Sequence, residues 1–240
     1  MKILIISHNF LPILNPRSTR VTELAKGFAK RNYDVTVITA PFKYDYSELK
    51  KKGIKVKKIK GKQIIINNFN THKTATISNR LTLLLKQFIK PVFNTFNPSG
   101  TSPLYLYHLI KLLINVDTKF DLLISNAHPV YTHIAVTIAT IFNSNIKSIP
   151  VKVAEYGDPL YGNPNYKKNI IHKLIDKSTN NTFDYISTPT LKAVKTLELV
   201  FNKDKIKVIP QGFNFTETKK AKYSKNKILT FAYAGVFYEK

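Results

Sequence analysis

Short apolar runs of strand length alternate along the chain with longer stretches whose apolar residues recur at helical spacing. Ile3–Ser7 is an apolar run, and Val35–Ile38 is rich in β-branched residues; both patterns predict strands. Between them, five apolar residues recur at the spacing of one helix face. They are Val21, Leu24, Ala25, Phe28 and Ala29.

The same alternation continues to about residue 210 and predicts the fold class. Further strands are predicted at Ile54–Ile59, Asp121–Ser125, Pro150–Ala154, Asp184–Thr188 and Lys207–Pro210. Further helices are predicted at Asn79–Phe96, Leu104–Asn115, Val130–Phe142, Asn169–Lys177 and Leu191–Phe201. Strands that alternate with helices predict an α/β, doubly wound, Rossmann-like fold, with a mainly parallel sheet covered by helices on both faces. Ligands of such folds bind beyond the carboxyl ends of the strands.

The last residues of the chain predict the start of a second domain. Ala232–Lys240 has the pattern of a buried strand that runs into a glycine turn, and the polar, lysine-rich stretch Thr216–Lys227 precedes it. We therefore predict a first domain over 1–218, a linker over 219–227, and the first strand of a second Rossmann-like domain over 228–240. The rest of that second domain is expected to be missing from the chain.

Composition excludes several classes of protein. The hydrophobic share of 43% and the aromatic share of 12% are typical of a folded protein. The chain has no cysteine, which excludes disulfides and thiolate metal sites and is compatible with the cytosol. Met1–Ser7 is too short for a signal peptide, and no run approaches the roughly 18 apolar residues of a spanning helix. We expect a cytoplasmic protein that is soluble or peripheral on the inner face of the membrane.

The charge is strongly positive. Lys and Arg total 38 against 14 acidic residues, a formal charge of +24. An excess of this size indicates either an anionic partner or a lysine-rich, solvated surface, and both interpretations stay open. The densest patch comprises Lys50, Lys51, Lys52, Lys55, Lys57, Lys58, Lys60 and Lys62. It has no interleaved aromatic residues and no RNA-binding or helix-turn-helix signature beside it, so an anionic membrane surface is a better match than nucleic acid.

The loop after the first strand has the features of an anion site. Asn15 and Pro16 are suited to the cap and first residue of a helix, with Ser18 as the competing cap. Arg17 and Arg20 stand in the first turns, where free backbone N–H groups favour a phosphate. The alternative is that both arginines are merely exposed and Ser18 only caps. The glycine patterns of dinucleotide-binding and P-loop proteins are absent.

Two later loops carry polar residues suited to a sugar. Asn126 and His128 follow a predicted strand, and His128 precedes a proline, where it is placed to hydrogen-bond a ligand or move a proton. Glu155, Tyr156 and Asp158 follow the next strand, and carboxylates with aromatic rings suit a polyhydroxylated ligand. The alternatives are a structural histidine and a simple turn. The other histidines show no spacing with acids that would build a metal site.

Several stretches carry a family resemblance. They are Lys2–Pro12 with Glu23–Thr39, Ser125–Pro129 with Val151–Asp158, Ile186–Lys192, and Ile206–Phe213 with Tyr233–Lys240. The first is similar to a strand, phosphate loop, helix and "G-H-x-V-x-V-x-T" strand. Ile206–Phe213 is similar to a "v-I-P-N-G-v" hinge, with Gln211 in place of the asparagine. On these stretches the chain resembles the N-terminal half of family 4 glycosyltransferases of the B fold, which include many capsule and lipopolysaccharide enzymes. The paired glycines that this family has in its first loop are replaced in this chain by the segment around Asn15–Ser18.

The resemblance implies transfer of a sugar from a nucleotide-diphosphate donor to a glycan or lipid-linked acceptor, with retention, in cell-surface polysaccharide synthesis. No metal or other cofactor is implied. The residues that it assigns to the donor phosphates are Arg17, Ser18, Arg20 and Gly212. It assigns catalytic contact to His128, and it assigns acceptor or sugar contacts to Asn126, Glu155, Tyr156 and Asp158.

The resemblance also implies a limit. The second domain of the family supplies most donor contacts, so we expect the chain alone to be inactive or nearly so. The helix predicted over Arg80–Phe96 would either dock on an anionic leaflet or belong to the core. The alternative function is a non-catalytic basic module that binds a membrane surface or nucleic acid; nucleic-acid binding would weaken steeply with salt.

Overall fold

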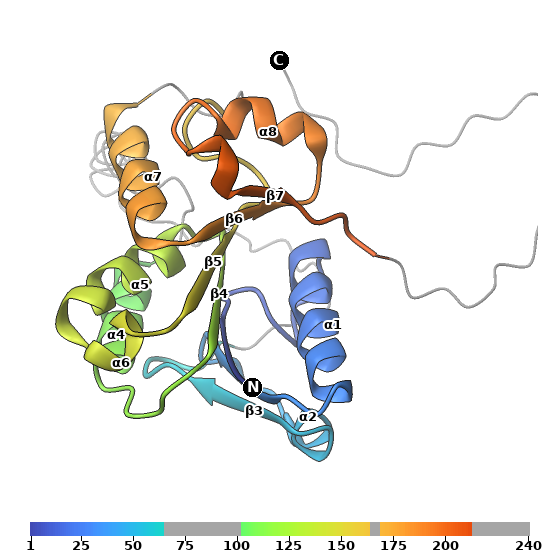
Figure 1. The fold of residues 1–240 in the computed structure, drawn as a ribbon. Coiled ribbons are helices and arrows are strands. Elements are labelled where there is room, and N and C mark those ends of the chain that lie inside the picture. The colour runs from blue at the N-terminus through green and yellow to red at the C-terminus, as the bar shows by residue number, and fades with distance from the viewer. Residues whose placement is uncertain (65–101, 164–168, 213–240) are drawn as a thin grey trace, which may run out of the picture.

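In the computed structural model of this chain, the described residues are 1–64, 102–163 and 169–212. Within them, seven strands form one parallel sheet in the order β3-β2-β1-β4-β5-β6-β7 (Figure 1). The strands are β1 (Lys2–Ile6), β2 (Asp34–Thr39), β3 (Ile54–Lys58), β4 (Leu122–Asn126), β5 (Val151–Glu155), β6 (Tyr185–Thr188) and β7 (Ile206–Val208). The order reverses between β1 and β4, which is where ligands of doubly wound folds bind.

Helices cover both faces of the sheet (Figure 1). They are α1 (Pro16–Lys30), α2 (Ser47–Lys51), α4 (Pro103–Ile114), α5 (Tyr131–Phe142), α6 (Ser144–Lys147), α7 (Ile170–Thr182) and α8 (Leu191–Leu197), with a 3-10 turn at Lys203–Lys205. The helix α1 lies on one face, and α4 and α5 lie on the other. Each parallel crossover therefore places a helix over the sheet, and the α/β, doubly wound prediction is confirmed.

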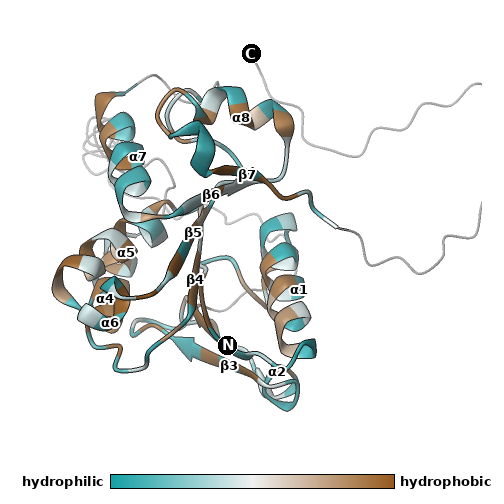
Figure 2. Ribbon diagram, in the orientation of Figure 1, coloured by the Kyte–Doolittle hydropathy of each residue, from teal (hydrophilic) through white to brown (hydrophobic). Residues whose placement is uncertain are grey.

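Alternate residues of β1 enter two separate hydrophobic cores. Ile3 and Ile5 pack with α1, β2 and β3 on one face, whereas Leu4 and Ile6 pack with α4 and α5 on the other. Because both faces are covered, the central strands are hydrophobic along most of their length (Figure 2). This explains why β1 appears in the sequence as a continuous apolar run rather than an alternating one.

The predicted strands agree with the structure to within two residues at either end. The short helices α2 and α6 and the 3-10 turn were not predicted, since segments of three to five residues are too short to show an apolar period. The helix α8 ends at Leu197, four residues earlier than predicted, because i to i+3 hydrogen bonds from Leu199 and Val200 tighten the chain there. The predicted helix over 79–96, the linker and the last strand lie outside the described residues.

The helix α7 is five residues longer than predicted, since it continues from Lys177 through a polar stretch to Thr182. Two threonine hydroxyls in that stretch donate hydrogen bonds back into the helix, from Thr179 to the Ile175 carbonyl and from Thr182 to the Ser178 carbonyl, at 3.0 and 2.9 Å. Threonine hydroxyls bonded in this way have their hydrogen-bonding capacity met by backbone carbonyls of the same helix. The polar stretch after Lys177, where the sequence predicted the end of the helix, is therefore compatible with its continuation to Thr182.

Candidate functional site at the carboxyl edge of the sheet

Three polar side chains meet where the sheet order reverses. Ser7 follows β1, Asn126 ends β4 and Glu155 ends β5, and all three are buried. The Ser7 hydroxyl donates to the Asn126 side-chain oxygen at 3.3 Å, and the Asn126 amide donates to Glu155 Oε2 at 2.5 Å. The sequence predicted Asn126 and Glu155 as site residues, and the structure joins them in one network beneath the surface.

The helix α1 begins at this edge. Its cap is Asn15, whose side-chain oxygen accepts a hydrogen bond from the Ser18 backbone N–H at 2.8 Å, and Pro16 is the first helical residue. Asn15 rather than Ser18 is therefore the cap. The Ser18 side chain is fully buried, and its hydroxyl has no hydrogen-bond partner among the described residues. A direct contact of that hydroxyl with a surface-bound phosphate does not fit this geometry.

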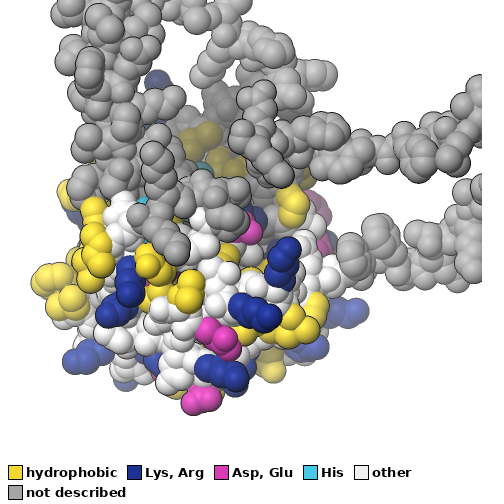
Figure 3. Space-filling model, turned by 90° about the horizontal axis from the view of Figure 1, so that it is seen from above, with side chains coloured by type: hydrophobic (Ala, Val, Ile, Leu, Met, Phe, Trp, Pro, Cys, Tyr) yellow, Lys and Arg dark blue, Asp and Glu magenta, His cyan; other side chains and the backbone are white. Residues whose placement is uncertain are grey.

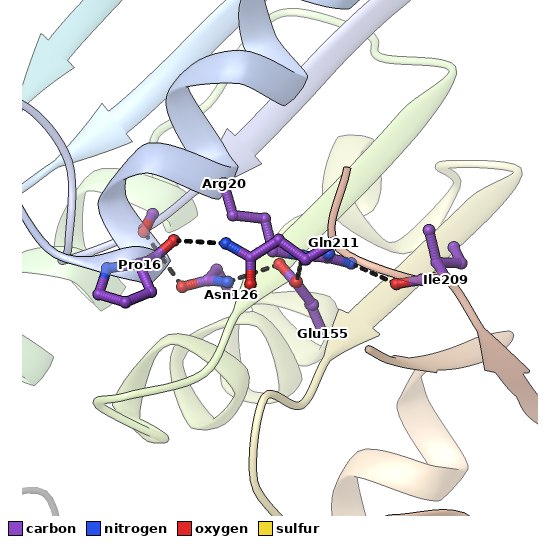
Figure 4. A network of polar contacts seen from close by, with 7 residues as sticks. Pro16, Arg20, Asn126, Glu155, Ile209 and Gln211 are labelled. Carbon is purple, nitrogen blue, oxygen red and sulfur yellow. Dashed lines mark hydrogen bonds and ion pairs between the residues drawn. The ribbon is translucent and has the colours of Figure 1, made fainter. Parts of the chain in front are cut away.

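Arg20 joins α1 to the network. Its guanidinium forms an ion pair with Glu155 through Nε and donates from Nη2 to the Ile209 carbonyl at 3.0 Å (Figure 4). The two side chains are only 15% and 5% exposed. The charge of Arg20 is thus neutralised inside the protein, and the expectation that Arg20 faces a donor diphosphate does not fit. Glu155 likewise holds α1 rather than presenting its carboxylate to a ligand.

The segment after β7 also returns to α1. Besides the Arg20 bond to Ile209, the Gln211 amide donates to the Pro16 carbonyl at 3.4 Å (Figure 4). Gly212 follows and is exposed, and an added Cβ there would meet nothing within 4 Å. The predicted hinge segment therefore lies at the start of α1, next to the candidate site.

Arg17 has a different setting from Arg20. Its Nη2 lies 2.7 Å from Asp158 Oδ2, but the two side chains are 37% and 56% exposed. Arg17 and Asp158 come from positions 141 residues apart, which the parallel sheet brings to one edge. The structure thus joins a predicted phosphate ligand, Arg17, to a predicted sugar ligand, Asp158, in an ion pair at the surface.

His128 lies in the electrostatic field of that pair. Burial, reinforced by Arg17 and opposed by Asp158, lowers the pKa of His128 to about 4. The backbone of His128 is left-handed, with φ of 57°, and precedes a cis bond to Pro129; its carbonyl accepts from the Asn9 amide at 2.6 Å. A left-handed residue other than glycine persists only where its surroundings hold it. At neutral pH this imidazole is uncharged, so that one ring nitrogen donates a hydrogen bond and the other accepts one.

The sequence-based prediction that the ring of Tyr156 faces a sugar is wrong. It is 1% exposed and packs against His133 and Phe201, with ring centroids 4.7 and 5.2 Å apart. Its hydroxyl donates to Asp176 Oδ1 at 2.9 Å. A ring buried in the core does not lie against a sugar, so Tyr156 supports the loop instead of lining the site.

Asp176, on α7, was not predicted from the sequence. Its second carboxylate oxygen accepts from the Tyr161 backbone N–H at 2.9 Å, so it holds both ends of the loop that carries Asp158. Burial raises the pKa of Asp176 to about 6, against the lowering effect of the Tyr161 and Tyr156 hydrogen bonds. Nothing in the sequence marks this acid, because the buried residues of α7 are the polar His172, Asp176 and Thr179, while Ile170 and Leu174 are exposed.

The described residues show neither a metal site nor a membrane span. Among them, no group of three or more His, Cys, Asp or Glu side chains is arranged to hold a metal ion. No helix in the same residues is long and apolar enough to cross a membrane.

The predicted lysine patch lies at the β3 end of the sheet, away from the reversal point between β1 and β4. Its residues are all exposed and lie on or beside α2 and the edge strand β3. On the face seen in Figure 3, Lys and Arg side chains stand in several separate places among hydrophobic, acidic and other side chains, as far as the described residues are visible. That face therefore shows no continuous basic patch.

No protein-family model matches the chain, and no curated protein matches it in sequence. Among solved structures, it is similar to HepE (Alr3699) of Anabaena in complex with UDP and glucose, with a TM-score of 0.50 and 14% identity over 89% of this chain and 45% of HepE. The HepE complex with UDP-glucose matches with the same TM-score and identity over 89% of this chain and 44% of HepE. CalG4, the calicheamicin glycosyltransferase, matches with a TM-score of 0.45 and 14% identity, over 91% of this chain and 54% of CalG4.

These likenesses concern the fold. The seven-stranded, Rossmann-like sheet of this chain corresponds to part of HepE, and the chain spans less than half of HepE's length. HepE was solved with UDP and with UDP-glucose bound.

Proposed function

We propose that the chain serves a glycosyltransferase of the B fold, family 4 type, as its N-terminal, acceptor-side part. The reaction moves a sugar from a nucleotide-diphosphate donor to a glycan or lipid-linked acceptor, with retention, in cell-surface polysaccharide synthesis in the cytoplasm. The observation that carries the proposal is the meeting of the start of α1, Arg17 and His128 at the reversal point of a Rossmann-like sheet. The fold likeness to HepE, which binds UDP-glucose, supports the nucleotide sugar as ligand.

Arg17 is the proposed contact to the donor diphosphate. The departure of the diphosphate concentrates negative charge, and a cation beside a helix N-terminus stabilises that charge without a metal ion. Arg17 is half-exposed at the second position of α1, so its guanidinium is accessible to a ligand. The exposed Gly212 follows Gln211, which contacts Pro16, and its missing side chain leaves room for the same group. Ser18 and Arg20 act from beneath, by shaping and holding the start of α1.

His128 is the proposed contact to the transferred sugar or to the acceptor hydroxyl. Because the pKa of His128 is lowered to about 4, its imidazole is neutral at pH 7 and is a weak base. Its role is therefore to orient a hydroxyl by hydrogen bonding. Asp158 is paired with Arg17 and is 56% exposed, whereas Asn126 and Glu155 are buried and position α1.

Ligand binding tests this proposal directly, without depending on turnover. Saturation-transfer NMR with UDP-glucose, UDP and GDP-mannose, with glucose and uridine as fragments, should show transfer to the nucleotide sugars and to UDP. Arg17→Gln should weaken those signals and leave the uridine signal unchanged. Because the second domain of this family supplies most donor contacts, weak transfer is expected; if no nucleotide diphosphate receives saturation, the proposal that this part of the protein contacts the diphosphate is wrong. Its assignment of Arg17 is wrong if Arg17→Gln binds UDP as wild type does.

A second candidate function is the docking of a non-catalytic module on an anionic membrane surface, and the eight exposed lysines around α2 and β3 favour it. Lysines along an edge strand also have a simpler role, since they oppose pairing with another chain. Replacing Lys50, Lys51 and Lys52 by Glu should abolish sedimentation with phosphatidylserine vesicles if the patch docks there. Unchanged sedimentation would exclude this patch. Binding to nucleic acid would instead fall steeply as salt is raised.

A further inference from the structure

The surface ion pair between Arg17 and Asp158 places a carboxylate where a ligand phosphate would sit. Asp158 Oδ2 lies 2.7 Å from Arg17 Nη2, the distance of a charge-assisted hydrogen bond. Phosphate oxygens bind arginine with the same geometry as carboxylate oxygens. An anion that approaches Arg17 therefore meets a position that Asp158 already fills.

The surroundings of the pair allow exchange. Arg17 and Asp158 are 37% and 56% exposed, and exposed pairs of this kind contribute little to stability because water and salt screen them. The residue before Asp158 is Gly157, whose missing side chain leaves only backbone facing the guanidinium; an added Cβ there would stand 3.7 Å from Arg17 Nε. Displacing Asp158 thus breaks one weak surface contact and disturbs no core residue.

The neighbouring pair behaves in the opposite way. Arg20 and Glu155 are nearly buried, and they share a network with Asn126 and the Ile209 carbonyl. A ligand anion cannot displace Glu155 without leaving a buried charge unpaired. Of the two arginines at the start of α1, Arg17 is therefore the one that can change partners.

We propose that Asp158 is an internal competitor that occupies Arg17 until a diphosphate displaces it. This inference rests on the proposed function, since it takes Arg17 as the diphosphate contact. This competition gives Asp158 a role in ligand specificity. A ligand with one weakly charged carboxylate gains little binding energy when it replaces the carboxylate of Asp158 at Arg17. A diphosphate carries more negative charge and more acceptor oxygens, so it gains more. Nucleoside diphosphates are favoured over monophosphates and carboxylates for that reason.

A calorimetric cycle tests the inference, with UDP as ligand and uridine as the ligand without phosphate. The proteins are wild type, Arg17→Gln, Asp158→Asn and the double variant. Asp158→Asn should bind UDP more tightly, by about fivefold at low salt, and uridine without change. In the Arg17→Gln background, Asp158→Asn should have no effect beyond a small general gain from charge.

Asp34→Asn provides the matched control. Asp34 forms a partly exposed pair with Lys55, its Oδ1 lying 3.0 Å from Lys55 Nζ, and it starts β2 at the opposite edge of the sheet. The substitution Asp34→Asn removes the same negative charge at a position outside the candidate site. The affinity of this variant for UDP should therefore equal that of wild type.

The outcomes separate the two proposals. If Arg17→Gln leaves UDP affinity unchanged, or wild type does not bind UDP, the proposed function loses its phosphate contact and the inference falls with it. If Arg17→Gln weakens UDP binding but Asp158→Asn leaves it unchanged, only the competitor role is wrong. Weaker binding by Asp158→Asn would also overturn that role and would indicate that Asp158 contacts the ligand itself. An equal gain in Asp34→Asn would reduce the effect to net charge.

Discussion

The guanidinium of Arg20 is paired with the carboxylate of Glu155, and this contact ties the first helix to the fifth strand. The same guanidinium donates to the carbonyl of Ile209, so the segment after the last strand is tied to the same point (Figure 4). One side chain thus fixes three parts of the chain that meet at the carboxyl edge of the sheet. The position of Arg17, one helical turn away from this anchor, depends on it.

Removing one partner of the Arg20–Glu155 pair should destabilise the protein strongly. Arg20→Met leaves Glu155 nearly buried with an uncompensated charge, which should lower the free energy of unfolding by about 3 kcal/mol. Urea unfolding followed by circular dichroism measures the change. The double variant Arg20→Met with Glu155→Leu should regain much of the loss, because it removes both charges.

Lys26→Met is the control on the same helix. Lys26 pairs with Glu23 on the surface, and its loss should cost less than about 1 kcal/mol. Equal costs for Arg20→Met and Lys26→Met would contradict the view that the buried pair anchors α1.

Asp176 should make stability depend on pH in the mildly acidic range. Burial raises the pKa of Asp176 from 3.8 to about 6 in the folded protein, so the folded state holds the proton to a higher pH than the unfolded state does. Stability is therefore lost as pH rises from about 4 to about 6, by at most about 1.4 kcal/mol per pH unit, and this contribution is constant above that window. Asp176→Asn should remove it.

The test compares urea midpoints of wild type and Asp176→Asn at pH 4, 5, 6 and 7. The difference between the two curves isolates Asp176 from the other carboxylates. Asp117→Asn, at an exposed site, should keep the wild-type pH dependence. If Asp176→Asn and wild type keep a constant offset over this range, the carboxyl of Asp176 does not titrate as its burial implies.

His128 should titrate far below an ordinary histidine. Because burial and Arg17 lower its pKa to about 4, the NMR shift of its ring proton should change with a midpoint near pH 4 and stay constant from pH 6 to 8. His128→Asn identifies the resonance by removing it. Arg17→Gln should move the midpoint upward and Asp158→Asn downward, since these two groups act on His128 with opposite signs. A midpoint near 6.5 would mean that the ring is solvated and outside the field of the pair.

Gly162 should not tolerate a side chain. Its φ is +81°, and an added Cβ would lie 2.9 Å from Thr196 Cγ2 and 3.0 Å from Leu199 Cδ1, where the loop that carries Asp158 packs on α8. Gly162→Ala should lower the free energy of unfolding by more than about 1 kcal/mol, from left-handed backbone strain and overlap together. Thermal unfolding provides the measurement.

Gly27→Ala is the opposite case among the glycines. Gly27 lies within α1, and an added Cβ meets nothing within 4 Å, so the substitution should stabilise the protein by about 0.5–1 kcal/mol. Destabilisation by Gly27→Ala, or a neutral Gly162→Ala, would show that these local environments do not control stability.

The sequence by itself determined the order of the elements and the edge of the sheet at which the candidate site residues lie. Apolar runs and helical spacing alternate clearly enough to predict β1, β2, α1 and α5 closely, because burial on both faces of a parallel sheet leaves a strong pattern. The loops with Arg17, His128 and Asp158 were expected to meet for the same reason, since parallel strands place their carboxyl ends together.

Only the tertiary structure decided which partner each charged residue meets and how deeply the pair is buried. Arg17 and Arg20 look alike in the sequence, yet one lies at the surface with Asp158 and the other is nearly buried with Glu155, 135 residues away. The packing of α1 on the sheet sets this difference, and the hydrophobic pattern of α1 does not encode which partner each polar residue meets. Tyr156 and Asp176 follow the same logic, because a hydrogen bond between α7 and the loop after β5 depends on how those two segments pack.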